Sequence, residues 1–179
     1  MFREIEHNIE EVRVVILHNL GNGYRQANKP EEAIKFYEKG VTVIKESGVS
    51  TANEVGLYQG LGQLYIDKKE FPRALENLRR ALEMAEKFQT PGAVYLANSM
   101  IGELFLWTQK PAEAIPYYKR ALENIESTRS LLESEELRRS YFEDKRGVYG
   151  GMIRAQLGTK NPVEAFNYSE RSRDRKSVV

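Results

Sequence analysis

Three segments of this chain repeat the same spacing of small and aromatic residues. In each segment a glycine is followed three residues later by an aromatic residue, and nine residues after that by an alanine. The glycines are Gly21, Gly62 and Gly102, so the period is 41 and then 40 residues. A fixed period of this length, with small and aromatic positions in phase, is typical of stacked helical repeats. It predicts an all-α fold of tandem antiparallel helix–turn–helix units stacked into an α-solenoid.

The second segment shows how one unit is expected to be built. Thr51 and Glu54 have the spacing of a capping box, which predicts a helix start. An apolar stripe at helical period follows it and consists of Tyr58, Leu61, Leu64 and Tyr65. Pro72 then opens a second stripe, as expected for a proline in the first turn of a helix. We expect the repeated glycines and alanines to let the two helix backbones of each unit approach closely.

The composition excludes several classes of function. Lys and Arg total 27 against 26 for Asp and Glu, a formal net charge of +1, which disfavours a nucleic-acid binder because such proteins need excess positive charge. The chain has no cysteine and two histidines, and we find no constellation for catalysis, a cofactor or a metal, so it is not expected to be an enzyme. The start has no apolar signal sequence, and the longest aliphatic run is residues 14–17. We therefore expect a soluble, cytoplasmic protein without a membrane span.

The three units resemble the tetratricopeptide repeat (TPR). The match extends to the position four residues after each alanine, which is occupied by Tyr37, Leu78 and Tyr118. The period of 40 or 41 residues exceeds the typical value of about 34, so longer helices are expected. The resemblance implies a right-handed superhelix whose concave groove is lined by the first helix of each unit.

The repeat pattern divides the chain, taken as a single domain, into five parts. The expected parts are a partial helix of a preceding repeat at 1–13, repeats at 14–50, 51–90 and 91–132, and a longer fourth helical hairpin at 133–179. Residues 130–176, with Ser-Glu-Glu-Leu-Arg at 134–138 and Glu-Arg-Ser-Arg at 170–173, resemble the last repeat of CHAT-family proteins. In that family TPRs precede a caspase-like protease domain. The resemblance implies that this chain is the sensor or recruitment part of a larger protein.

The TPR resemblance also implies which side chains line the groove. The implied positions are His18, Asn22, Arg25, Gln26, Gln59, Gln63, Asp67, Ser99, Glu103 and Trp107. Amide side chains both donate and accept, which suits them to the backbone of an extended peptide. The alternative is that these amides are only solvated. Trp107 is either an exposed anchor for a partner or a packed core residue.

These observations predict a scaffold that binds a protein or peptide through its concave groove. A second hypothesis stays open, because solenoid ends without polar capping helices expose apolar surface. In that case the chain would be a self-assembling protein, a homo-oligomer formed through its uncapped ends.

Overall fold

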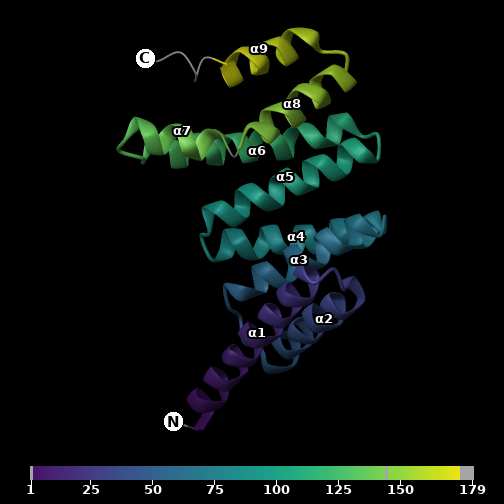
Figure 1. Cartoon of the computed structure of the whole chain (residues 1–179), viewed down its shortest axis with the longest axis vertical. Coiled ribbons are helices and arrows are strands. Elements are labelled where there is room, and N and C mark those ends of the chain that lie inside the picture. The colour runs from purple at the N-terminus through teal and green to yellow at the C-terminus, as the bar shows by residue number, and fades with distance from the viewer. Residues whose placement is uncertain (1, 144, 174–179) are drawn as a thin grey trace. The chain divides into compact units, whose positions relative to one another are not determined.

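The computed structural model describes residues 2–143 and 145–173, and in these residues all regular structure is helical. The helices follow one another in tandem (Figure 1). They are α1 (Phe2–Gln26), α2 (Pro30–Ser47), α3 (Asn53–Asp67), α4 (Phe71–Lys87), α5 (Pro91–Trp107), α6 (Pro111–Ser130), α7 (Glu135–Glu143), α8 (Arg146–Gly158) and α9 (Pro162–Arg173). The prediction of an all-α fold of tandem antiparallel helix pairs is confirmed. Prolines occupy the first position of α2, α6 and α9, where a missing backbone N–H costs little.

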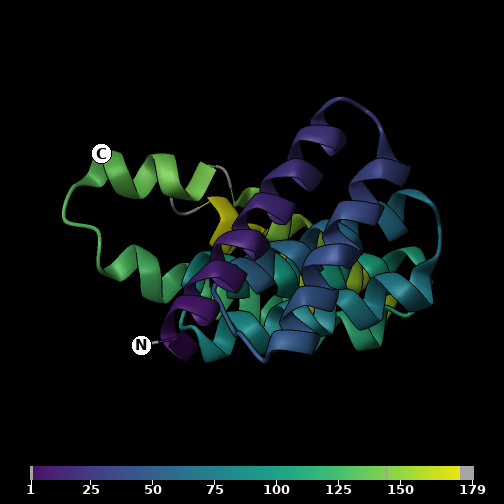
Figure 2. The ribbon, with the colours of Figure 1, turned by 90° about the horizontal axis from the view of Figure 1, so that it is seen from below.

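The chain divides into two compact units, residues 1–93 and 94–179. In the first unit, α1 pairs with α2 and α3 pairs with α4, and α3 also packs on α1 and α2. Figure 2 shows the first hairpin, with α1 and α2 side by side and antiparallel. In the second unit, α8 packs on both α6 and α9, and α7 packs on α6. Each unit has its own buried core of aliphatic and tyrosine side chains.

The repeated glycines make room for a side chain of the second helix. A Cβ added to Gly21 would lie 2.5 Å from Cδ1 of Tyr37, and one added to Gly102 would lie 2.9 Å from Cζ of Tyr118. At Gly62 the nearest atom is Cδ2 of Leu78, at 2.6 Å. The space freed by each glycine holds the side chain four positions after the repeated alanine, and at Gly62 the backbone nitrogen of Leu78 also lies 3.6 Å from the added Cβ, so the two backbones approach closely there.

Tyr37 and Tyr118 also each meet a glycine of a later helix, α3 for Tyr37 and α8 for Tyr118. A Cβ on Gly60 of α3 would lie 2.6 Å from the Tyr37 ring, and one on Gly151 of α8 would lie 2.5 Å from Oη of Tyr118. Both tyrosine residues are fully buried. Each ring thus lies between two glycines from different helices, which fixes the distance between a hairpin and the next helix.

Three features differ from the sequence-based expectations. The boundary placed between residues 13 and 14 falls inside α1, which is 25 residues long against 15 for α3. The stretch from residue 133 contains three helices, α7 to α9, among its described residues, while residues 144 and 174–179 lie outside them. The capping box at Thr51 is not formed, because Oγ1 of Thr51 accepts from the amide of Asn53 at 3.1 Å and the Glu54 carboxylate accepts from Ser50 at 3.3 Å.

Five turns between helices share one backbone conformation. In the first, the amide of Lys29 donates to the carbonyl of Tyr24 at 2.9 Å, a bond typical of a Schellman motif. The preceding residue has a positive φ in each turn although it is not glycine. These residues are Asn28 (56°), Lys69 (60°), Gln89 (50°), Gln109 (58°) and Lys160 (59°). Turns of different sequence thus share a left-handed residue, both within the hairpins and, at Gln89, between α4 and α5.

Candidate protein-binding site

In the first unit, three side chains form a hydrogen-bonded network between α1 and α2. The Tyr37 hydroxyl donates to Oδ1 of Asn22 at 2.7 Å, and Nδ2 of Asn22 lies 3.1 Å from Nε2 of His18. Since the Asn22 amide nitrogen can only donate, Nε2 of His18 accepts and the ring is neutral. His18 and Asn22 are therefore held in fixed positions by the buried Tyr37.

His18 is half-buried against α3, the first helix of the next repeat. A Cβ on Gly56 of α3 would lie 2.9 Å from Cε1 of His18, so the glycine makes room for the imidazole. Burial, and secondly the positive charge of Arg25, lower the pKa of His18 below its ordinary value of 6.5. Both effects favour the neutral ring that the bond from Asn22 requires.

The other predicted groove residues of this unit differ in their exposure and in whether their side chains already form a hydrogen bond. Arg25 and Gln26 are exposed at the end of α1. On α3, Nε2 of Gln63 donates to Oδ1 of the exposed Asp67 at 2.9 Å. Gln59 is already engaged, because its Nε2 donates to the carbonyl of Ala93 at 3.2 Å. The structure thus brings His18 and Asn22 together, and separately pairs Gln63 with Asp67.

In the second unit, Glu103 of α5 forms an ion pair with Arg154 of α8. Glu103 is partly buried and Arg154 is mostly exposed. Burial of Tyr118, and secondly the nearby Glu103 carboxylate, raise the pKa of the Tyr118 hydroxyl. Ser99 is half-buried one turn before Glu103 on the same helix.

Trp107 lies at the last position of α5 and is 54% exposed. It is therefore a surface residue, and the alternative of a packed core tryptophan is wrong. Glu103 and Trp107 are four residues apart, which places them on the same side of the helix. Tryptophan and arginine are both enriched at protein interfaces relative to the rest of the surface.

The described residues contain no group of three or more histidine, aspartate or glutamate side chains arranged to hold a metal ion. A search of the same residues finds no helix with the length and apolar character needed to cross a bilayer.

Sequence analysis missed three groups that shape the site. Tyr37 was noted as a repeat position but not as the residue that anchors Asn22, and Arg154 was not identified as the partner of Glu103. Gly60 of α3, which faces Tyr37, was not singled out either. The sequence contained one signal for this ion pair. Glu103 lies eleven residues before Ala114 and Arg154 lies eleven residues before Ala165, so the two residues have equivalent positions in their repeats.

Residues 12–87 match the family model described as tetratricopeptide repeat. This match supports the TPR resemblance over the first unit, where α1 to α4 form two hairpins. No curated protein sequence matches the chain.

The fold is similar to several solved structures. BtubC (BKLC) from P. vanneervenii aligns with a TM-score of 0.81 at 15% identity, covering 94% of this chain and 65% of that one. Aspartyl phosphate phosphatase F from Bacillus subtilis aligns with a TM-score of 0.73 at 15% identity, covering 90% of this chain and 39% of that one. YrrB, described as a TPR protein with an unusual peptide-binding site, aligns with a TM-score of 0.51 at 20% identity, covering 99% and 92%. At these identities the likeness concerns the fold, and the chain spans less than two thirds of the first two proteins.

Proposed function

We propose that this chain is a scaffold that binds a protein or an extended peptide through the exposed faces of its first helices. The observation that supports this most is the network in which Tyr37 holds Asn22 and His18 in place. Side chains fixed before binding lose little conformational entropy when a ligand arrives. Beside them, Arg25 and Gln26 are exposed at the end of α1, where a ligand can reach them.

The chemistry of this face suits a peptide backbone rather than a charged terminus. Gln26 and Gln63 each offer one donor and one acceptor group, the pair that an extended peptide needs. The charges of Arg25 and Asp67 balance, so neither strongly acidic nor strongly basic ligands are favoured. In the second unit, Trp107 offers an apolar anchor of the kind found at interface hot spots.

The test uses a library of random displayed peptides selected against the intact chain. A selected peptide is then titrated by fluorescence anisotropy against the wild type and the double variant Gln26→Ala, Gln63→Ala. Each lost hydrogen bond costs about 0.5–1.5 kcal/mol, so the dissociation constant should rise by about 5- to 100-fold for the pair. Neither residue is buried, so the variant should keep its fold.

The matched control is the double variant Asn77→Ala, Arg79→Ala on α4, a second helix. It should bind the same peptide with unchanged affinity. Equal weakening by the two double variants, or no weakening by the first, would contradict the proposed site.

We further propose that this scaffold regulates a caspase-like protease domain of the CHAT kind within a larger protein. The support is the resemblance of residues 130–176, whose two motifs lie at the start of α7 and in the last turns of α9. An immunoblot of cells of the source, using an antibody against this chain, should show a band far heavier than 20.6 kDa. A single band at 20.6 kDa would contradict the proposal.

A further inference from the structure

The outer face of α1 has a continuous stripe of large apolar side chains in contact with solvent. Successive members are three or four residues apart, so they share one side of the helix. They are Ile5, Ile9, Val12, Ile16 and Leu20, with exposed fractions of 49%, 57%, 57%, 53% and 42%. Single exposed apolar residues are ordinary, but a contiguous row of five marks an interaction surface.

The equivalent positions of the next repeat show which kind of partner the stripe on α1 suits. Ile16 and Leu20 correspond, 41 residues later, to Leu57 and Leu61, whose exposed fractions are 0% and 3%. On α3 these positions face α2, where a Cβ on Gly40 would lie 2.8 Å from Cδ2 of Leu57. The stripe on α1 therefore has the composition of a helix–helix contact, with another helix as its natural partner.

We propose that the stripe binds the same stripe of a second copy of this chain, with the two α1 helices antiparallel. From Ile5 to Ile16 the steps are four, three and four residues, which is the spacing of a coiled-coil seam. In the antiparallel register, Ile5 lies opposite the partner's Ile16 and Ile9 opposite the partner's Val12. Ile16 and Val12 of the first copy then meet the partner's Ile5 and the partner's Ile9, so the contact is two-fold symmetric.

Charge complementarity selects this orientation. Glu6 and Arg13 are seven residues apart and flank the stripe on the same side. In the antiparallel pair that side of one helix faces the same side of the other, so Glu6 approaches the partner's Arg13 and Arg13 approaches the partner's Glu6. In a parallel pair, the flank of one helix that contains Glu6 and Arg13 would face the other flank of the partner helix, which contains Asn8 and Val15. These two residues carry no charge, so no ion pair would form.

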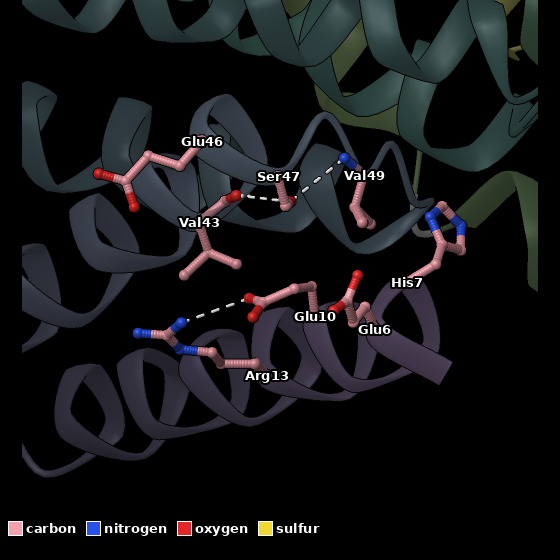
Figure 3. A pocket seen from close by; sticks show the side chains of 8 residues that line it. All are labelled: Glu6, His7, Glu10, Arg13, Val43, Glu46, Ser47 and Val49. Carbon is pink, nitrogen blue, oxygen red and sulfur yellow. Dashed lines mark hydrogen bonds and ion pairs between the residues drawn. The ribbon is translucent and has the colours of Figure 1, made fainter. Parts of the chain in front are cut away.

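An open cavity of about 650 Å³ lies along the same edge, between α1 and the C-terminal part of α2 (Figure 3). Its lining residues are Glu6, His7, Glu10, Arg13, Val43, Glu46, Ser47 and Val49. Three of them are carboxylates, while Arg13 pairs with Glu10 at 3.3 Å across an exposed surface. The cavity thus has excess negative charge and room for the guanidinium of the partner's Arg13.

In the second unit, α9, the last helix among the described residues, does not offer an equivalent partner face. Where α2 places Tyr37, Gly40 and Val41 against the next helix, the corresponding positions of α9 are Ser169, Ser172 and Arg173. These three positions are polar, as in a capping helix, although the exposed Phe166 lies three residues before Ser169 on the same side. Head-to-tail stacking into filaments is therefore disfavoured, and the α1 contact closes as a dimer.

The first test is the mass in solution, measured by light scattering over roughly 1–300 µM because dimerisation follows mass action. The wild type should reach twice the chain mass of 20.6 kDa, and the double variant Val12→Glu, Ile16→Glu should stay at that mass. Its matched control, Val163→Glu with Phe166→Glu, changes two exposed apolar residues of α9 and should still dimerise. A wild type that stays monomeric, or a dimer that persists in the first variant, would overturn the proposal.

The second test fixes the orientation, using the absence of native cysteine. Chains with Ile9→Cys and chains with Val12→Cys, of different tag size, are mixed and oxidised. The antiparallel pair predicts cross-links mainly between the two kinds of chain. Cross-links mainly within each kind would indicate a parallel pair and overturn the proposed register.

Discussion

Gly150 and Gly151 are neighbours in α8 but have different surroundings, so alanine should have opposite effects at the two positions. An added Cβ at Gly150 meets nothing within 4 Å. At Gly151 the Cβ would lie 2.5 Å from Oη of Tyr118, and Gly102 of α5 lies against the same ring, since a Cβ there would be 2.9 Å from Cζ. Because the Tyr118 side chain is fully buried, the ring has little room to move away from an added Cβ.

The magnitudes follow from two opposing effects. Alanine is favoured over glycine within a helix by about 0.5–1 kcal/mol, and this is the whole effect expected at Gly150. At Gly151 the same gain is opposed by overpacking, which costs about 1–3 kcal/mol and more when neighbours are fixed. We expect Gly150→Ala to raise the free energy of unfolding and Gly151→Ala to lower it, with a difference equal to the overpacking cost, about 1–3 kcal/mol.

Urea unfolding followed by the fluorescence of Trp107 measures this difference, because the only tryptophan lies in the same unit as α8. With a denaturant slope of about 1–3 kcal/mol per molar, the two midpoints should differ by about 1 M urea. As a control, Gly151→Ala is repeated in a Tyr118→Leu background, where leucine is the residue that the second repeat has at this position. There the cost of Gly151→Ala should fall. Equal midpoints for Gly150→Ala and Gly151→Ala would refute the proposed packing of Tyr118.

Two further predictions concern the network on α1. The pKa of His18 is lowered in the folded protein, so the unfolded chain binds more protons below pH 6.5 and the free energy of unfolding should fall as the pH drops through that value. Urea midpoints at about pH 7.5 and about pH 5.5 should differ more for the wild type than for His18→Gln, and an equal difference would contradict this. Tyr37→Phe removes the bond donated to Asn22 and should cost about 0.5–1.5 kcal/mol, so an unchanged urea midpoint would show that water replaces it.

The hairpins could be predicted from sequence because their signals are local. Pro30, Pro111 and Pro162 mark helix starts, and the apolar period marks which side of each helix is buried. The full length of α1 could not be predicted, since residues 2–13 contain no proline or glycine and nothing in their composition distinguishes one long helix from two shorter ones.

The candidate site was predictable only as a set of positions. The role of His18 depends on Gly56 of α3, and the ion pair of Glu103 depends on Arg154, 51 residues away. Such contacts arise from the stacking of helices, which residue propensities do not encode. The choice between glycine and a larger residue at position 60 or 151 also depends on the tyrosine of the preceding hairpin, so it is a pairwise constraint rather than a local one.

The five matching turns have a practical consequence for chemistry on this protein. Asn28, Lys69, Gln89, Gln109 and Lys160 differ in side chain but share a backbone conformation, and all five are exposed. A left-handed φ is the preferred region of a D-amino acid, so a mirror-image residue would fit there with less strain than the natural one. In a chain assembled by peptide ligation, these turns are equivalent attachment points, where a dye or cross-linker could be placed without disturbing the helices on either side.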